Sequence, residues 1–270
     1  LIYICINVFI ETFSKHAETG SVRGIFLVLM NMGILISPVL AGVVLSKSSF
    51  TALYVVATAA LVPFLFFLHQ YLKHAKEPVY HSLNMFKAFF KAWRDKNLKG
   101  ALIAAFILEC FYGVMVIYSP IYLASIGIPL VVYLSVILPF ALLPFVVMPY
   151  ELGWLADTKI GEKELLILGL IIMSISVLLM VTIGTTNILV WILLFILSRV
   201  GAACAETMTF TYYFKKVSAE DASLTALFGN MRSLAIIAVG AVGFLVSPLL
   251  VTYPQLMFII LGCAILISIL

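Results

Sequence analysis

Charged residues are scarce in this sequence. Asp, Glu, Lys and Arg make up 10% of its 270 residues, whereas hydrophobic residues make up 64%, far above the roughly 45–50% of a soluble domain. The core of a chain of this length does not need so much apolar surface, so the excess must face lipid. We therefore expect membrane lipid, and no nucleic acid, among its partners.

The sequence also lacks the motifs of several function classes. Its four cysteines, Cys5, Cys110, Cys204 and Cys263, fall on four different apolar runs without CxxC spacing, and buried cysteines of this kind behave as small hydrophobes. No nucleotide-binding GxxxxGK[ST] loop, no HExxH and no paired-Asp diphosphate motif occurs. We expect no metal, no cofactor and no enzymatic activity.

What the sequence holds instead is a series of long apolar runs. A membrane-spanning helix needs about 20 apolar residues, and runs without Asp, Glu, Lys or Arg cover residues 24–46, 48–72, 110–150, 165–198 and 233–270. The last three are long enough to reverse, and Gly, Pro or Asn residues predict turns near 127–129, 184–187 and 252–254. These patterns predict an all-α polytopic membrane protein, with helices near residues 1–11 (a stub), 22–46, 51–72, 100–124, 129–150, 164–183, 188–213, 223–250 and 254–270.

The basic residues predict the orientation of these helices. Loops 11–23, 73–99, 151–164 and 213–222 hold thirteen Lys and Arg residues, whereas the opposite loops hold only Lys47. Under the positive-inside rule the first set is cytoplasmic, in a multi-pass protein of the cell (plasma or inner) membrane.

One of these loops contains an amphipathic pattern. In the long connection 73–99, the apolar residues Leu83, Phe86, Phe90 and Trp93 recur at helical spacing, with basic residues on the other side. This predicts a helix lying in the membrane interface. A soluble linker helix and a protein-binding site are the alternatives.

Residues 149–165 form a short polar stretch between two apolar runs. Six charged residues fall within it, an unusual density for this chain. They predict either a simple loop at the membrane boundary or a conformational latch.

The layout of helices resembles the C-terminal three quarters of a major facilitator superfamily transporter, from about the fourth to the twelfth helix. The resemblance implies the superfamily's two-bundle helical fold with an incomplete first bundle. Residues 1–72 would end the N-terminal bundle, 73–99 would link the bundles, and 100–270 would form the C-terminal six-helix bundle. It also implies that spans 51–72, 164–183 and 254–270 face lipid.

Two motifs carry this resemblance. Within 149–165, Gly153, Leu155, Asp157, Lys159, Gly161 and Lys163 are similar to the superfamily's signature between paired helices, with one extra residue before Gly161 and with Glu162 in place of a basic residue. The second motif, similar to the fifth-helix motif of proton-coupled antiporters, consists of Gly24, Gly33, Ser37, Pro38, Ala41 and Gly42. Ordinary small-residue helix packing explains this second pattern equally simply.

On this placement the signature loop is predicted to be a gate. Asp157 would meet the N-terminus of the 22–46 helix, where free backbone N–H groups and Arg23 favour an anion. Such a contact would close the cytoplasmic side when the carrier faces outward.

Four ionisable residues fall within predicted spans: Glu109, Arg199, Glu206 and Arg232. Charges in membrane helices are costly and face a bundle interior or a cavity. Glu109 and Arg232 lie roughly nine residues, or about 14 Å, from the cytoplasmic ends, and Arg199 lies near the middle of its span. We expect a substrate and proton pathway at this depth. The alternatives are a structural Glu109–Arg strut and pairing of Glu206 with loop 151–164 or 213–222.

These features together predict a secondary active transporter that moves a small solute by alternating access, is coupled to protons and works as a monomer. Two midplane arginines favour uptake of an anionic metabolite. The alternatives are a drug/proton antiporter, as the fifth-helix motif suggests, and a non-transporting sensor or scaffold on the same fold.

Overall fold

The computed structural model describes residues 22, 24–33, 36, 44, 48–72, 85–217 and 221–269, and all regular elements within them are helical. They are α3 (Phe50–Leu72), α4 (Met85–Arg94), α5 (Lys96–Ser125), α6 (Leu130–Val132), the π-helix η2 (Tyr133–Ile137), α7 (Leu138–Thr158), α8 (Glu162–Thr182), α9 (Ile188–Phe214), α10 (Ala222–Leu245), α11 (Ser247–Leu250) and α12 (Leu256–Ile269). A helical segment, Gly24–Gly33, precedes them. The predicted all-α fold is confirmed. The predictions for residues 1–11, Arg23, Ser37, Pro38, Ala41, Gly42 and Leu83 fall outside the described residues.

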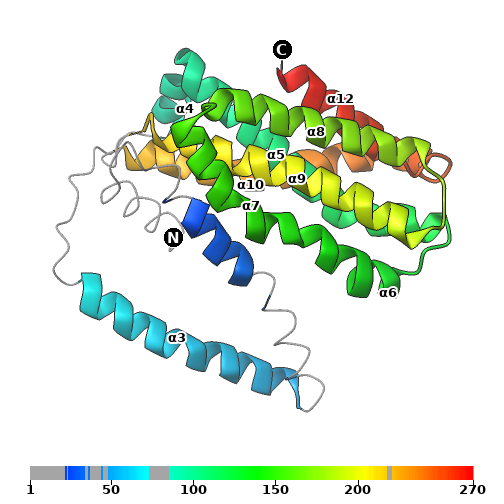
Figure 1. The fold of residues 1–270 in the computed structure, drawn as a ribbon, viewed down its shortest axis with the longest axis horizontal. Helices are drawn as coiled ribbons and strands as arrows, with labels where there is room; N and C mark the ends of the chain where they lie inside the picture. Colours follow the sequence, from blue (N-terminus) through cyan, green and yellow to red (C-terminus); the bar gives the residue numbers. More distant parts are fainter. Residues whose placement is uncertain are drawn as a thin grey trace.

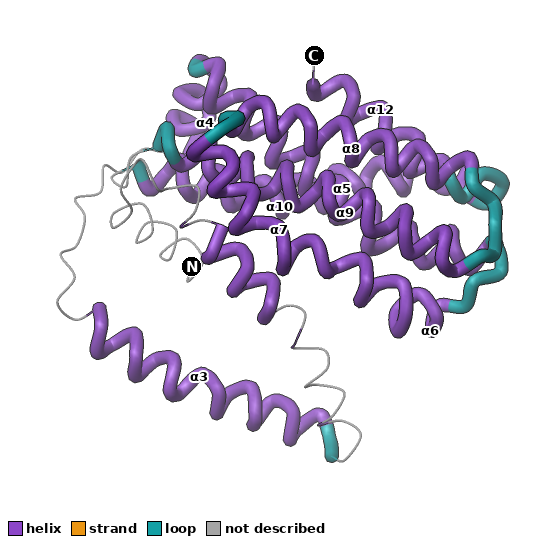
Figure 2. Tube along the Cα trace, viewed as in Figure 1, coloured by secondary structure: helices purple, strands orange, loops and turns teal. Residues whose placement is uncertain are grey.

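Helices α5, α7, α8, α9, α10 and α12 run side by side in one bundle (Figures 1 and 2). Helix α9 packs against α5, α7 and α8, and every residue from Gly201 to Phe214 is buried. A Cβ on Gly201 would lie 2.5 Å from the backbone nitrogen of Met173, and one on Gly169 would lie 2.8 Å from that of Ala205. The backbones of α8 and α9 therefore touch, and only glycine fits at these two positions.

Five described helices are long and apolar enough to cross a membrane: Lys96–Ser125, Leu138–Thr158, Glu162–Thr182, Ile188–Phe214 and Ser223–Leu245. Helix α3 stands apart from the other described helices (Figure 1) and exposes large side chains such as Leu61 and Phe66. Apolar side chains on the outside of helices of this length fit a protein surrounded by lipid.

The described turns include all three predicted reversals. The one near 252–254 separates α11 from α12, and the other two show how they form. Gly127 has a φ of +94°, a conformation that side chains with a Cβ rarely adopt. At the start of α9, Asn187 Oδ1 accepts a hydrogen bond from the Leu189 backbone nitrogen, and Trp191 Nε1 donates to Thr185 O at 2.7 Å. All three turns are confirmed.

Two predicted helix boundaries are wrong. The span 223–250 breaks at Val246, just before Ser247 and Pro248, because proline lacks the N–H that continues a helix. The polar stretch 149–165 is mostly helical: α7 continues to Thr158, and only residues 159–161 separate it from α8. The extension forms because Leu152 and Ala156 are buried in a cluster with Cys204 and Met208 of α9.

The amphipathic helix is present as α4. Its buried residues are Ala88 and Ala92, whereas Phe86, Phe90 and Trp93 are exposed, as an interfacial helix requires. Its place in the membrane interface stays a prediction. Lys91 Nζ lies 2.8 Å from Asp221 Oδ2, next to the start of α10, so this lysine forms an ion pair within the chain.

Candidate functional site

Arg199 is buried in the middle of the bundle. Only 3% of its surface is exposed, and its guanidinium carbon lies 4.9 Å from the centre of the Phe111 ring. Its neighbours include Tyr112 and Tyr133. Within the described part of the chain, Nε and Nη1 have no hydrogen-bond partner. A buried guanidinium without an acidic partner is costly, so this position is a candidate for anion binding.

Glu206 lies on the same helix and is 8% exposed. Its carboxyl group approaches Tyr112 of α5 and Asn31 of the Gly24–Gly33 segment. Among the described residues, neither Tyr112 Oη nor Glu206 Oε2 completes a hydrogen bond. Tyr112 is thus a neighbour of both Arg199 and Glu206, which lie two helical turns apart on α9.

Glu109 and Arg232 form a loose ion pair between α5 and α10. Arg232 Nε lies 3.9 Å from Glu109 Oε2, and the Arg232 side chain is 72% exposed. At this distance and exposure the pair contributes little to stability. The charges of both groups also interact with the carboxyl group of Glu206. We refer to Glu109, Tyr112, Arg199, Glu206 and Arg232 as the interior cluster.

The structure differs from one sequence-based alternative for this cluster. Glu206 lies inside the bundle beside Tyr112 and not at the loops 151–164 or 213–222. The reason is that nearly every side chain of α9 after Ser198 packs inward. Nothing local in the sequence distinguishes Tyr112 and Asn31 from the other polar residues in the predicted spans.

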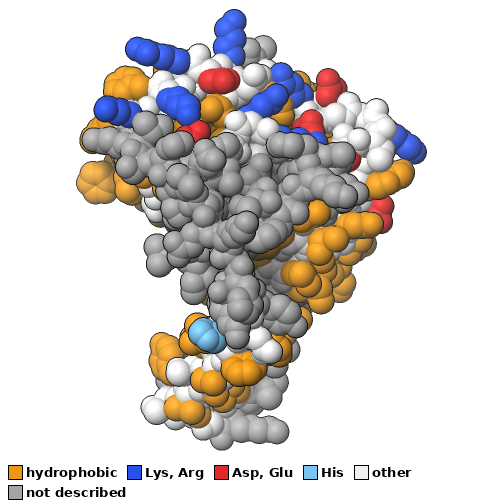
Figure 3. All heavy atoms as spheres, turned by 90° about the vertical axis from the view of Figure 1, so that its left-hand side faces the viewer, with side chains coloured by type: hydrophobic (Ala, Val, Ile, Leu, Met, Phe, Trp, Pro, Cys, Tyr) orange, Lys and Arg blue, Asp and Glu red, His pale blue; other side chains and the backbone are white. Residues whose placement is uncertain are grey.

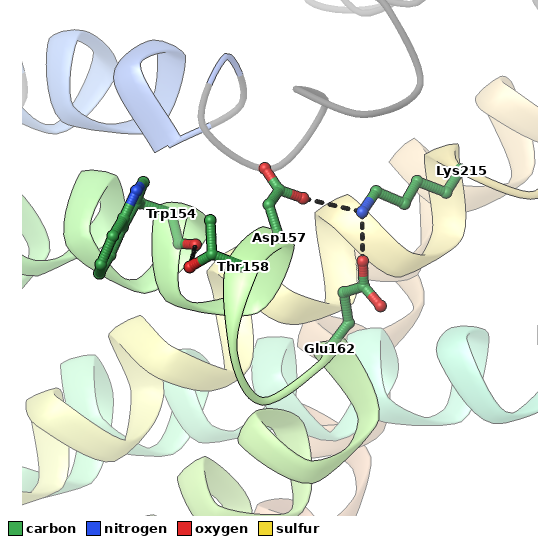
Figure 4. Close-up of polar contacts among 5 residues, drawn as sticks. All are labelled: Trp154, Asp157, Thr158, Glu162 and Lys215. Carbon is green, nitrogen blue, oxygen red and sulfur yellow. Dashed lines mark hydrogen bonds and ion pairs between the residues drawn. The ribbon is translucent and has the colours of Figure 1, made fainter.

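A second group of charges joins three helices at one end of the bundle. Lys215, at the end of α9, donates to Asp157 Oδ1 at 2.8 Å and to Glu162 Oε1 (Figure 4). Asp157 belongs to the last turn of α7, and Glu162 to the first turn of α8. We refer to these three residues as the clamp.

The clamp keeps Lys215 charged. Partial burial by itself lowers the pKa of the Lys215 ammonium, but the hydrogen bonds and charges of Asp157 and Glu162 outweigh it, so the pKa is raised above its ordinary value. Figure 3 shows other charged side chains gathered on this end of the molecule. We call it the charged end.

The remaining residues of the signature stretch are described as well. Gly153 is buried in α7. Gly161 has a φ of +96° and makes the turn into α8. Lys159 Nζ lies 5.2 Å from the centre of the Trp154 ring, and Lys163 Nζ donates to Asn97 Oδ1 at 3.3 Å. Because Arg23 lies outside the described residues, the latch between it and Asp157 stays a prediction.

Lys215 was not predicted as a partner of Asp157. The sequence places it only among the basic loop residues, and no local pattern links it to residues more than fifty positions away. Only the packing of α7, α8 and α9 brings them together.

The Gly24–Gly33 segment packs closely against α7. A Cβ on Gly24 would lie 2.5 Å from the carbonyl oxygen of Pro149, and Asn31 Nδ2 donates to Phe145 O at 3.1 Å. No atom of the described residues lies within 4 Å of the position that a Cβ on Gly33 would take, so the described packing does not require glycine there. One of the two described glycines of the fifth-helix motif therefore makes a close contact between helices.

No group of three or more His, Cys, Asp or Glu residues in the described ranges is arranged to hold a metal ion. The interior cluster offers charge and proton-carrying groups instead.

A family model described as Major Facilitator Superfamily matches residues 1–240 of this chain. No curated protein matches it.

Proposed function

Since the chain belongs to the major facilitator superfamily, whose members are membrane transporters and not enzymes, we propose that it moves a small anionic solute together with protons. Transport would proceed by alternating access between two helix bundles, with the charged end in the cytoplasm. The interior cluster would bind both substrate and proton. The observation that carries this proposal is the buried guanidinium of Arg199, which has unpartnered nitrogen atoms in the described bundle.

Arg199 is the proposed anion-binding residue. Its guanidinium suits a planar carboxylate because it offers several N–H donors in a fixed geometry. The Phe111 ring holds the guanidinium by a cation–π contact. A substrate carboxylate would therefore supply the partner that Arg199 lacks among the described residues.

Glu109 and Arg232 are the proposed coupling pair. When Glu109 is ionised, it attracts Arg232; when Glu109 takes up a proton, Arg232 becomes available to the substrate anion. A separation of 3.9 Å suits such a pair, because little energy holds it together. Glu206, buried beside Tyr112, is a second carboxyl group in the same pathway. Proton binding and anion binding would then favour each other.

Transport assays in proteoliposomes test the proposal. The full-length protein is reconstituted, a pH gradient is imposed, and uptake of a panel of labelled mono- and dicarboxylates is measured. We expect gradient-driven uptake of at least one of them. If no solute moves under the gradient, the transporter function proposed here is wrong.

Glu109→Gln tests the coupling step. The variant should lose proton-driven accumulation but keep substrate exchange, because glutamine imitates the protonated carboxyl group. Glu151→Gln is the matched control, since Glu151 is an exposed carboxylate outside the interior cluster. Unchanged proton coupling in Glu109→Gln would exclude its proposed role.

The second candidate is proton-coupled efflux. It rests on the resemblance of the stretch that begins at Gly24 to the antiporter motif, and the close contact of Gly24 with Pro149 is compatible with it. The same proteoliposomes separate the two functions: an antiporter moves its solute against the direction of proton flow, whereas the proposed symporter moves it in the same direction.

A further inference from the structure

A cavity of about 190 Å³ lies at the charged end, where α5 and α8 begin and α9 and α12 end. Part of its lining is polar, with Lys96, Asn97, Lys163 and Tyr212. Apart from Ser268, the rest is apolar and includes Leu170 and Ile269. We refer to it as the α5–α8–α12 crevice. It is separate from the interior cluster, so no residue of the proposed transport pathway lines it.

The polar part of the crevice presents hydrogen-bond donors. Asn97 Oδ1 accepts from Tyr212 Oη at 2.7 Å and from Lys163 Nζ at 3.3 Å. Because its oxygen already accepts two hydrogen bonds, Asn97 can offer a ligand only its NH₂ group, which is a donor. The ammonium group of Lys163 lies beside it, and Lys96, an exposed lysine, also lines the crevice.

No acidic residue of the described chain lines the crevice. Three carboxylates are next to lining residues in sequence. Asp95 caps α5: its Oδ1 accepts hydrogen bonds from the backbone nitrogens of Asn97 and Leu98. Glu162 binds Lys215, and Glu164 is not among the lining residues. The crevice thus carries two positive charges and mostly donors, and it fits a ligand with a negative charge and several acceptor oxygens. A phosphate group has both.

The aromatic side chains of α4 indicate where this site lies relative to the bilayer. Phe90 and Trp93 are exposed one to two turns before Lys96, and Lys99 Nζ lies 4.8 Å from the centre of the Trp93 ring. Tryptophan, whose ring is amphipathic, gathers at the headgroup level of a membrane. We infer that the apolar wall of the crevice, which follows the first turns of α5 and α8, lies on the hydrocarbon side of the two lysines.

We propose that the α5–α8–α12 crevice binds an anionic phospholipid, with its phosphate between Lys96 and Lys163 and an acyl chain along the apolar wall. Basic pockets between membrane helices recognise anionic headgroups through this combination of charge and depth. A free phosphate ion would use the lysines but has no use for the apolar wall. A zwitterionic lipid would use the wall but gains less from the two positive charges.

Lipid titration tests the proposal on the full-length protein in neutral detergent. Binding is measured by native mass spectrometry and by thermal unfolding with phosphatidylglycerol, phosphatidylcholine or inorganic phosphate. We expect phosphatidylglycerol to bind and to raise the melting temperature, whereas the other two do not. Equal effects of phosphatidylcholine, or the full effect from inorganic phosphate alone, would overturn the proposal.

Charge removal locates the site. The double variant Lys96→Gln/Lys163→Gln should weaken phosphatidylglycerol binding roughly fivefold for each lysine removed. The control is Lys216→Gln, which changes an exposed lysine at the same end but outside the crevice and should bind the lipid as the wild type does. Wild-type affinity in the double variant would refute the assignment. If the double variant does not fold, Lys96→Gln alone makes the same test, because no described packing contact depends on that exposed side chain.

Discussion

Replacing Lys215 by Met should destabilise the C-terminal bundle, because Lys215 is the shared cation of two carboxylates. The side chains of Lys215, Asp157 and Glu162 are 22%, 6% and 20% exposed. Breaking a fully buried ion pair costs about 3–5 kcal/mol, whereas an exposed pair contributes ~0–1 kcal/mol. For this partly buried group we expect a loss of about 2–3 kcal/mol, which lowers Tm by roughly 5–10 °C.

The assay is thermal unfolding of the purified protein in detergent, followed by intrinsic tryptophan fluorescence. Lys216→Met serves as the control, since Lys216 is the next residue along the chain and is exposed. Its effect should stay within about 0.5 kcal/mol. If Lys215→Met and Lys216→Met lower Tm equally, the clamp does not hold the ends of α7, α8 and α9 together.

A double-mutant cycle with Glu162→Gln measures the interaction itself. Lys215→Met should cost less in the Glu162→Gln background, with a coupling energy of about 1 kcal/mol or more. Additive effects would refute the clamp even if the single variants are destabilised.

The pH dependence of the clamp follows from the raised pKa of Lys215. Its stabilisation is complete below the ordinary lysine value of 10.5 and is lost only as the pH rises through the higher value in the folded protein. The difference in Tm between wild type and Lys215→Met should therefore stay constant between about pH 6 and 9. A difference that disappears within this range would contradict the assignment of Lys215 as the charged partner.

Three further substitutions, with Gly240→Ala as a control, test the packing and the pathway. Gly201→Ala should destabilise the protein by about 2 kcal/mol, because its Cβ would lie 2.5 Å from the Met173 nitrogen. Gly240→Ala, at a position with no described atom near the added Cβ, should be neutral or stabilising by up to ~1 kcal/mol. Equal shifts of Tm in the two variants would contradict this reasoning. Gly161→Ala should cost about 1–3 kcal/mol in denaturant unfolding, because few side chains adopt its backbone conformation, and an unchanged midpoint would show that the turn rearranges freely. Arg199→Met should leave Tm unchanged or higher, because it removes a buried charge with unpartnered nitrogens, while abolishing carboxylate uptake; retained uptake would exclude Arg199 from the substrate site.

The sequence determined the class of protein and most of its helices, because those properties depend on local patterns. A run of about 20 apolar residues is a helix in lipid, since backbone groups there must be satisfied within the segment. Gly127 and Asn187 likewise mark turns through their own backbone and side-chain preferences. The ionisable residues within the spans were also found from the sequence, because a charged residue in an apolar run can be recognised without knowing the direction of its side chain.

Only the tertiary structure decided which of these residues meet. The end of α7 is helical because Leu152 and Ala156 pack against residues of α9. Hydropathy alone predicts a loop there, because charged residues lie beside them. Glu206 lies near Tyr112, and Lys215 joins Asp157 to Glu162, because α9 packs between α5, α7 and α8. Such contacts join positions far apart in the chain, and their energies depend on distance and burial, which no local pattern of residues contains.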